Sequence, residues 1–401
     1  MRRRTTIVAA AGLAVVVGAR SQPLYTDVTA THLPAGIAGA CMNADAGDAD
    51  GDGDLDLALA MEYAPKILLE NDGKGRFRNA ASQLPRTVHD SEDVSFADFD
   101  GDGDLDLVFV SEDDRKDELY LNDGHGRFSD VSDRLTPDDV TNGSVVFDLN
   151  GDGAPDVLTG NIGVDRALIN DGTGRFRDET ATRWAQGSSE SRTQELEAFD
   201  ADGDGDLDVA VANEGQNQLY RNDNGVLVDV TATHLPREND ESREIRAADF
   251  DGDGDLDLVV GNVRFVLDEP EIDTLLLNDG KGAFTPAPAG SLPASGDASN
   301  FMIQAVDLDG DADVDVIAPN TVFERAAGTY RVLLNDGKAR FSVAAPGAVL
   351  PVSADGNGFA VEVADFDGDG HADLFLCNRA SYGDDPERSG GVQRLLLNRG
   401  R

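Results

Sequence analysis

Short apolar runs, separated by acidic and glycine-rich turns, recur along the chain. The clearest unit contains "ADFDGDGDLDLVF" at 97–109, where an aspartate-rich loop lies between predicted strands at 94–99 and 105–110. The second strand is almost continuously apolar, which is typical of a strand buried on both faces. A third apolar run, "LYL" at 119–121, leads through an Asn-Asp-Gly turn to a fourth run that begins at Phe128. Because Asp-Gly between apolar runs is a strong hairpin signal, each unit is predicted to form four antiparallel strands.

The unit is repeated through most of the sequence. Versions of the aspartate loop follow one another at intervals of 49 to 58 residues and begin at Asp48, Asp98, Asp148, Asp200, Asp249, Asp307 and Asp365. Four short strands in about 50 residues, repeated in this way, predict an all-β fold, a seven-bladed β-propeller of four-stranded blades. A linear β-solenoid is the alternative, but solenoid repeats are usually shorter, and a solenoid leaves both ends open.

The first and last parts of the chain complement each other. Three strands are predicted in the last unit, between 359 and 398, and the fourth is missing. The segment "DVTATHLP" occurs inside the array at 229–236 and also alone at 27–34, before the first complete unit. We therefore expect residues 24–29 to form a fourth strand that completes the last blade and closes the ring, which leaves no unpaired sheet edge.

The charge of the chain limits the possible partners. Asp and Glu number 77 against 33 Lys and Arg, so the formal net charge is −44. Such a chain is expected to repel nucleic acid and anionic membranes. Acidity with few apolar residues would indicate disorder, but 40% of the residues here are hydrophobic and can form a core. Metal binding is the simplest remaining explanation of the acidity.

The N-terminus has the pattern of a signal peptide. Three arginines at 2–4 precede an apolar stretch at 7–18, and small residues up to Ala19 offer a cleavage site. The stretch is too short to span a bilayer, and a short buried helix is the alternative. The sequence therefore predicts a signal peptide at 1–19, a single propeller domain at 24–401, and a protein that is secreted or held in the periplasm or cell envelope.

The aspartate loops have the form D-x-D-x-D-G-x-x-D. Carboxylates at positions 1, 3, 5 and 9 can converge on one cation, a glycine at position 6 permits the sharp turn, and position 7 offers its backbone carbonyl. Oxygen ligands without His or Cys sets favour Ca²⁺ over Zn²⁺. We predict up to seven Ca²⁺ sites, whose candidate ligands are, loop by loop, Asp48, Asp50, Asp52, Asp54 and Asp56; Asp98, Asp100, Asp102, Asp104 and Asp106; Asp148, Asn150, Asp152, Ala154 and Asp156; Asp200, Asp202, Asp204, Asp206 and Asp208; Asp249, Asp251, Asp253, Asp255 and Asp257; Asp307, Asp309, Asp311, Asp313 and Asp315; and Asp365, Asp367, Asp369, His371 and Asp373.

Two of these loops are expected to bind more weakly than the others. In the third, Asn150 replaces a carboxylate, and Ala154 and Pro155 stiffen the later half. In the sixth, Ala312 replaces the turn glycine, where a left-handed backbone would be penalised. Because Ca²⁺ at tenfold above its Kd adds about 1.4 kcal/mol per site, seven sites would add about 10 kcal/mol. The ions are therefore expected to be mainly structural.

Repeats of the form "ADFDGDGDLDLVF", "LLLNDGKGAF" and "DVT" resemble the FG-GAP or VCBS-type repeats of bacterial secreted proteins. These repeats are similar to the calcium-binding blades of the integrin α-subunit propeller. The resemblance covers about residues 24–401, and it implies a seven-bladed propeller with Ca²⁺ in the loop between strands one and two. The resemblance is specific for the fold and the metal. It does not determine the function, because members of the family include adhesins, carbohydrate-binding proteins and accessory domains of enzymes.

A partner is expected on the face opposite the aspartate loops, where the loops vary in length and content. Three arginines lie at similar places in the last three units, each near an aromatic residue: Arg264 with Phe265, Arg325 with Phe323, and Arg379 with Tyr382. Together they could hold an acidic polysaccharide or a carboxylate of a protein partner. The alternative is that these arginines only neutralise neighbouring acids.

The two cysteines and the one tryptophan leave alternatives open. Cys41 begins strand one of the first unit and Cys377 ends strand two of the last, so ring closure would bring them together away from the aspartate loops. Two cysteines in an exported chain can form a disulfide or remain free thiols. Trp184 lies between units, where it serves either core packing or a sugar platform.

The pattern favours a binding protein over an enzyme. No nucleophile elbow, HExxH motif or Ser/His/Asp set occurs in the sequence, although paired carboxylates for catalysis are not recognisable from spacing alone. We therefore expect a monomeric, secreted calcium-binding scaffold for adhesion or ligand binding, without enzymatic activity. A polysaccharide lyase or hydrolase on a propeller fold is the alternative.

Overall fold

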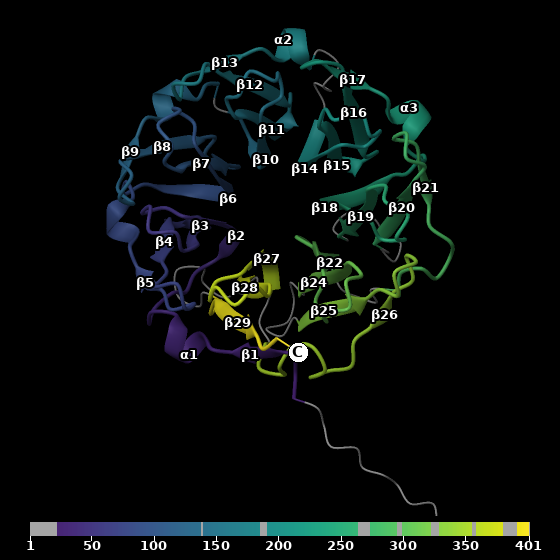
Figure 1. Cartoon of the computed structure of the whole chain (residues 1–401). Helices are drawn as coiled ribbons and strands as arrows, with labels where there is room; N and C mark the ends of the chain where they lie inside the picture. The colour runs from purple at the N-terminus through teal and green to yellow at the C-terminus, as the bar shows by residue number, and fades with distance from the viewer. Residues whose placement is uncertain are drawn as a thin grey trace, which may run out of the picture.

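The computed structural model describes residues 22–137, 139–184, 191–263, 273–294, 299–321, 329–354, 358–379 and 391–400. These residues fold into repeated antiparallel units, most of them of four strands, in which consecutive strands pair side by side. In three places the end of strand two also pairs with the start of strand one of the next unit. Figure 1 shows the sheets arranged in a ring, with the first strand of each nearest the centre and the fourth at the rim. The prediction of an all-β fold from repeated four-stranded units is confirmed.

The strands follow the repeats of the sequence. The first two sheets contain β2 (Cys41–Gly47), β3 (Asp56–Pro65), β4 (Ile67–Glu70) and β5 (Arg78–Asn79), then β6 (Val88–Ala97), β7 (Asp106–Ser111), β8 (Glu118–Asn122) and β9 (Phe128–Asp130). The next two contain β10 (Thr141–Phe147), β11 (Asp156–Gly163), β12 (Arg166–Asn170) and β13 (Phe176–Asp178), then β14 (Ser191–Phe199), β15 (Asp208–Gly215), β16 (Gln218–Asn222) and β17 (Leu227–Asp229).

The later sheets are more variable. One contains β18 (Asp240–Ala248), β19 (Asp257–Asn262), β20 (Thr274–Asn278) and β21 (Phe284–Pro286). In the next, strand one is broken into β22 (Ser299–Asn300) and β23 (Gln304–Val306), followed by β24 (Asp315–Thr321), β25 (Thr329–Leu334) and β26 (Ser342–Val343). The last contains β27 (Gly358–Ala364), β28 (Asp373–Asn378), β29 (Arg394–Asn398) and β1 (Tyr25–Asp27).

The helices are single turns between sheets: α1 (Thr29–His32), α2 (Thr180–Arg183), α3 (Thr231–His234) and the 3-10 helices η1 (Ala81–Gln83) and η2 (Ser132–Arg134). Within the described residues, none is long and apolar enough to cross a membrane.

The core lies between neighbouring sheets. Every residue of β7 is buried, as its continuous apolar pattern predicts, because both of its faces pack against another sheet. Aromatic pairs mark these contacts: Phe99 meets Phe176 of the following sheet edge to face, with ring centroids 5.7 Å apart. Trp184 is fully buried and packs edge to face on Tyr220 at 5.3 Å, so it is a core residue and not a sugar platform.

The two ends of the chain meet in the last sheet. β1 pairs antiparallel with β29, so Tyr25 lies opposite Asn398, and the predicted fourth strand is confirmed. The strand is shorter than predicted, because the side chain of Asp27 accepts a hydrogen bond from the Thr29 backbone N–H at 3.1 Å and starts α1. The same sequence at 229–236 behaves in the same way, so "DVTATHLP" is a short strand end followed by a helical turn.

Covalent and polar contacts also join the first and last sheets. Cys41 and Cys377 form a disulfide with their Cα atoms 5.2 Å apart, which decides between the two alternatives that the sequence left open. At the other end of the strands, Asn71 Nδ2 donates to the Phe366 carbonyl at 2.8 Å. The asparagines of the other Asn-Asp-Gly turns do the same toward the preceding sheet, as Asn122 does toward the Ala49 carbonyl. The first and last sheets therefore share the asparagine contact that joins the interior sheets, and the disulfide is an additional link.

Candidate metal loops and mouth pocket

The aspartate loops turn sharply because their first carboxylate accepts backbone hydrogen bonds across the turn. Asp48 Oδ1 accepts from the Gly51 N–H at 2.8 Å, and Asp48 Oδ2 accepts from the Gly53 N–H at 3.0 Å. Gly53 has a φ of +95°, a conformation that glycine adopts without strain. The turn brings the first and third side chains of the loop to the same side.

The last carboxylate of each loop fixes two further backbone groups. Asp56 Oδ2 accepts from the Ala49 N–H at 2.9 Å, and its Oδ1 accepts from the Asn71 N–H at 2.8 Å. Asp106, Asp156, Asp208, Asp257, Asp315 and Asp373 make the same pair of contacts in their own sheets. This residue therefore ties the loop to the Asn-Asp-Gly turn. Each oxygen still has a second lone pair for a cation.

Carboxylates from positions 1, 3 and 9 converge in several loops. One carboxylate oxygen from each lies within 4.8 Å of the others in the groups Asp48, Asp50 and Asp56; Asp98, Asp100 and Asp106; Asp200, Asp202 and Asp208; and Asp249, Asp251 and Asp257. In addition, the Oδ1 atoms of Asp50, Asp100, Asp202 and Asp309 are buried and have no hydrogen-bond partner among the described residues. A hard cation would supply the missing partner, so these residues fit Ca²⁺ or a similar ion.

The side chains at positions 5 and 7 contact the turn backbone, whereas those at positions 1, 3 and 9 converge on one another. Asp52 Oδ1 accepts from the Asp54 N–H at 3.1 Å and so shapes the end of the turn. A Cβ added at Gly73 would lie 2.4 Å from Asp54 Oδ2, so the Asp54 side chain lies against the Asn-Asp-Gly turn of its own sheet. That position 7 offers its backbone carbonyl to a cation stays a prediction.

The convergence of carboxylates affects their titration. Burial raises the pKa of the last loop carboxyl to about 7 at Asp56, Asp106, Asp315 and Asp373 and to about 6 at Asp156, Asp208 and Asp257. The neighbouring loop carboxylates raise these pKa values further, while the backbone N–H groups lower them. Burial is thus the main cause of the raised pKa values, and repulsion between the loop carboxylates adds to it.

The two loops that the sequence sets apart also differ in structure. Asn150 Oδ1 accepts from the Asp152 N–H at 2.9 Å, a bond that Asp251 and Asp367 also accept in their own loops at 3.3 Å, so the third loop differs in having a neutral amide at this position. Ala312 has a φ of +75°, in the left-handed region that the corresponding glycines adopt elsewhere. The backbone of the sixth loop is therefore strained, as the sequence predicts.

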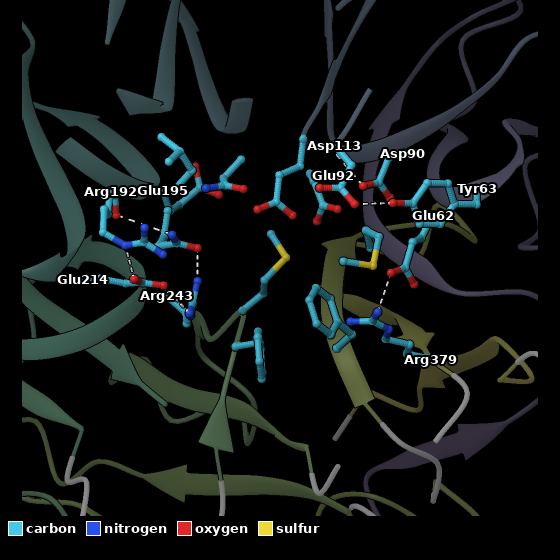
Figure 2. Close-up of a pocket in the computed structure, with 18 residues that line it drawn as sticks. Glu62, Tyr63, Asp90, Glu92, Asp113, Arg192, Glu195, Glu214, Arg243 and Arg379 are labelled. Atoms are coloured by element: carbon cyan, nitrogen blue, oxygen red, sulfur yellow. Dashed lines mark hydrogen bonds and ion pairs between the residues drawn. The ribbon is translucent and has the colours of Figure 1, made fainter. Parts of the chain in front are cut away.

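The opposite face of the ring carries a pocket of about 450 Å³, which we call the mouth pocket (Figure 2). Strand one of most sheets contains a β-bulge near its start, where one extra residue interrupts the pairing with strand two. The six extra residues all line the mouth pocket: Met42, Glu92, Asn142, Gln194, Arg243 and Phe359. Phe301, between β22 and β23, is the seventh lining residue of this kind. The β-bulge thus directs a different side chain from each of these strands into the mouth pocket.

The wall of the mouth pocket is apolar on one side and charged on the other. Phe301 and Phe359 stack with centroids 4.7 Å apart, and Met42 and Met302 continue this apolar side. Figure 2 shows Asp90, Glu92 and Asp113 gathered beside Tyr63, across the pocket from Arg192, Glu214 and Arg243. The pocket is therefore amphipathic, as ligand sites usually are.

Ion pairs organise the charged side chains. Arg192 and Arg243 both pair with Glu214, the latter at 2.7 Å, and Arg379 pairs with Glu62. Burial raises the pKa of Glu92 well above its ordinary value, and the nearby charges of Asp90 and Glu112 raise it further. The acidic wall thus holds carboxyl groups that oppose one another's ionisation.

Tyr63 lies at the rim and combines exposure with backbone strain. Its side chain is 53% exposed, its φ is +49°, and its hydroxyl donates to Asp113 Oδ2 at 2.5 Å. A non-glycine residue with positive φ is uncommon and often marks a binding surface.

Only part of the predicted arginine crescent can be placed. Arg379 lines the mouth pocket, pairs with Glu62 and lies over the Phe359 ring at 5.6 Å. One carboxylate partner, Glu62, thus comes from the first sheet, in keeping with the neutralising role that the sequence left open. Arg264, Phe265, Phe323, Arg325 and Tyr382 lie outside the described residues.

The sequence nevertheless contained a signal for the pocket. The bulge residues and Phe301 all stand six positions before the first aspartate of their loop, yet they include apolar, acidic, amide and basic side chains. A position that varies inside an otherwise regular repeat is typical of a binding surface on a rigid scaffold.

A family model described as an FG-GAP-like repeat matches residues 48–109, 98–159, 148–211, 200–260 and 322–376. No curated protein matches the sequence. Among solved structures, BBS1N in complex with ARL6DN is similar over 94% of this chain and 98% of its own, with a TM-score of 0.58 and 13% identity.

Two further structures are similar. An Agrocybe aegerita lectin matches over 86% of this chain and 87% of its own, with a TM-score of 0.51 and 18% identity. The extracellular domain of the BT4673 one-component system from B. thetaiotaomicron matches over 94% of this chain and 40% of its own, with a TM-score of 0.54 and 10% identity. At such identities the likeness concerns the fold, which is a propeller-like arrangement of repeats.

Proposed function

The chain belongs to the FG-GAP-like repeat family, and from this premise we propose that it is a secreted, calcium-stabilised, seven-bladed β-propeller that binds a ligand in the mouth pocket. The count of seven blades is supported by the seven aspartate loops, each followed by its own strands two and three. The pairing of β1 with β29 supports a closed ring, since it supplies the fourth strand of the last blade.

Calcium is supported by the donor set of the loops. Carboxylates of positions 1, 3 and 9 meet in space, and the buried Oδ1 atom of position 3 has no hydrogen-bond partner in several loops. The chain's own residues already bind the loop to the adjacent turn, so the ion would mainly hold together carboxylates that otherwise repel. This is a structural role, in which the ion stabilises the scaffold.

Export is supported by two independent features. The N-terminal sequence has the basic and apolar segments of a signal peptide at 1–19. The disulfide between Cys41 and Cys377 is of a kind that forms and persists in oxidising compartments outside the cytosol.

The observation that carries ligand binding is the convergence of the bulge residues on one pocket. Their differing chemistry on a repeated backbone gives a surface that is specific to this chain, and Tyr63 adds an exposed aromatic ring at the rim, carried on backbone of positive φ. Aromatic rings beside polar and charged groups suit carbohydrates, and the same mixture suits a protein surface. The Agrocybe aegerita lectin, which recognises non-reducing terminal N-acetylglucosamine, shows that a similar fold serves sugar binding in another protein. We favour a polysaccharide, with a protein ligand as the second possibility.

A binding screen tests this function. The purified protein is applied to arrays of glycans, acidic glycans included, and of cell-surface proteins, with Ca²⁺ and with chelator. The hit is then measured with Tyr63→Ala and with a control, Val343→Ala, which removes a side chain of similar exposure on an outer strand. We expect Tyr63→Ala to weaken binding at least tenfold and the control to bind normally.

Two results would contradict the proposal. Equal binding by both variants would place the ligand outside the mouth pocket, and the absence of any ligand in the screen would argue against a binding scaffold. Cleavage of a glycan during the assay would instead favour the alternative function, a polysaccharide lyase or hydrolase.

A further inference from the structure

A second group of converging carboxylates lies in the mouth pocket, at the opposite end of the strands from the aspartate loops. Asp90 and Glu92 lie near the start of β6, and Glu112 follows the end of β7. One carboxylate oxygen from each lies within 4.8 Å of the other two. β6 runs from this group toward the loop that begins at Asp98, so the two groups are separated by the length of the strand.

The hydrogen bonding of Asp90 is incomplete. Its side chain is only 2% exposed; Oδ2 accepts from the Asp113 N–H at 3.2 Å, whereas Oδ1 is buried without a hydrogen-bond partner in the described part of the chain. The hydroxyl of Tyr63 lies nearby, but its single proton is donated to Asp113 Oδ2 at 2.5 Å. A buried carboxylate oxygen without a partner is costly, so a ligand that completes it is favoured.

The arginines of the pocket have carboxylate partners elsewhere. Arg379 pairs with Glu62, and Arg192 and Arg243 pair with Glu214. Figure 2 shows these ion pairs to the sides of the group formed by Asp90 and Glu92. Within the described part of the chain, these arginines thus pair with carboxylates other than the three acids, whose remaining charge a bound cation would balance.

The same two features mark the aspartate loops. There too, three carboxylates offer oxygens within 4.8 Å of one another, and a buried Oδ1, as in Asp50 or Asp100, has no hydrogen-bond partner. We propose that Asp90, Glu92 and Glu112 form a further divalent-cation site inside the mouth pocket, separate from the loop sites. Carboxylate ligands without His or Cys select a hard cation such as Ca²⁺ or Mn²⁺ over Zn²⁺.

The position of this site distinguishes it from the loop sites. Three carboxylates leave several coordination positions of a six- to eight-coordinate ion unfilled, and those positions face the 450 Å³ pocket. On the premise of the proposed function, an oxygen atom of the pocket's ligand would take one of them. The loop ions stabilise the ring, whereas this ion belongs to the binding surface.

Crystals of the calcium-loaded protein soaked in MnCl₂ test the site directly, since Mn²⁺ has an anomalous signal. We expect an anomalous peak in contact with Asp90, Glu92 and Glu112, which is lost in Glu92→Gln crystals while the ions of the aspartate loops remain. The absence of a peak between the three carboxylates in the wild-type crystals overturns the proposal.

Native mass spectrometry in Ca²⁺ gives a second test that needs no crystal. The Glu92→Gln variant should carry one Ca²⁺ fewer than the wild type, and Glu112→Gln should do the same. The control Asp114→Asn removes an equal charge two residues further along, at a carboxylate that pairs with His89, and should carry the wild-type number. Equal numbers in all four proteins overturn the site. Neither test uses a pocket ligand, so a failure here is distinct from a failure of the binding screen.

Discussion

The two faces of the ring are built from the same strands but use the repeat in opposite ways. On the aspartate-loop face, each repeat places the same atoms in the same positions, so that Asp56 and its counterparts all accept from two backbone N–H groups. On the mouth face, most repeats keep the same bulge but change the side chain that it presents, from Met42 to Glu92 to Arg243. The difference separates stability from specificity: repeated chemistry holds the ring together, and varied chemistry on a repeated backbone forms a pocket.

Removal of metal should break the loop face first and have the largest effect. If the loops hold Ca²⁺, a chelator leaves converging carboxylates to repel one another, and the loss of seven ions would cost about 10 kcal/mol of unfolding free energy. Calorimetry with Ca²⁺ and with EDTA measures the fall in melting temperature. The pocket variant Gln194→Ala should show the same chelator shift as the wild type. An unchanged melting temperature in EDTA would exclude a structural role for calcium.

The first and last sheets are joined by a different contact on each face of the ring. On the aspartate-loop face, Asn71 donates a hydrogen bond to the Phe366 carbonyl. On the mouth face the contact is the disulfide, which closes a loop of 336 residues. Replacing both cysteines, in Cys41→Ser with Cys377→Ser, should cost about 2–5 kcal/mol, because the unfolded chain regains conformational entropy. Urea unfolding in Ca²⁺ measures the loss. If the double variant unfolds at the same urea concentration as the wild type, the polar contacts around Asn71 hold the first and last sheets together without the disulfide.

A buried acid near the mouth face should make stability depend on pH. Asp165, in the turn between β11 and β12, is fully buried, and burial raises its pKa to about 7. The folded state therefore keeps this proton to a higher pH than the unfolded state, and stability is lost as the pH rises from about 4 to about 7. Above pH 7 the loss would be about 2–4 kcal/mol.

The variant Asp165→Asn tests this dependence with a control that the chain itself supplies. Asp165 Oδ1 accepts from the Asn161 N–H at 2.8 Å, and in the next sheet Asn217 Oδ1 accepts from the Asn213 N–H at the same distance. The variant should thus fold normally and gain stability over the wild type between pH 5 and pH 8, as measured by urea unfolding at fixed Ca²⁺. A difference that does not change with pH would show that Asp165 stays charged when folded.

The smallest expected effect on stability concerns the turn position of the aspartate loops, where one loop has alanine and the others have glycine. Ala312→Gly should raise the unfolding free energy by about 1 kcal/mol, since it relieves the left-handed strain at φ +75°. The reverse change at the matching position of the first loop, Gly53→Ala, should cost a similar amount by strain alone, because a Cβ there meets no atom within 4 Å. Thermal unfolding in Ca²⁺ measures both. Effects of the same sign at the two positions would contradict this explanation.

Much of the fold could be predicted because it depends on local pattern. The buried strand 105–110 is observed as β7 (Asp106–Ser111), and the hairpin turns lie where Asn-Asp-Gly occurs. The prediction for strand one was less accurate: β6 starts at Val88 and not at 94, because its first residues pair with β3 of the preceding sheet. Such pairing depends on the neighbour, and the alternation of apolar and polar residues within the strand does not report it.

The loop carboxylates were found from spacing, but the mouth pocket was not. Glu92, Arg243 and Phe359 are far apart in the sequence and share no motif, so only their common distance from the next loop connects them. The variable loops predicted Arg379 as a ligand-binding residue. The β-bulges that direct side chains into the pocket are irregularities of the backbone, and no particular residue type marks them in the sequence.

The sequence by itself determined the repeat, the all-β class, the loops with converging carboxylates and the strand that joins the two ends of the chain. These follow from local preferences: turn residues, strand periodicity and the spacing of ligands around a turn. Only the tertiary structure decided that Cys41 and Cys377 are bonded, that Trp184 is core, and that the bulge residues and Phe301 face one pocket. Those outcomes depend on how neighbouring sheets are placed around the ring, and that placement is set by packing between residues that are distant in sequence.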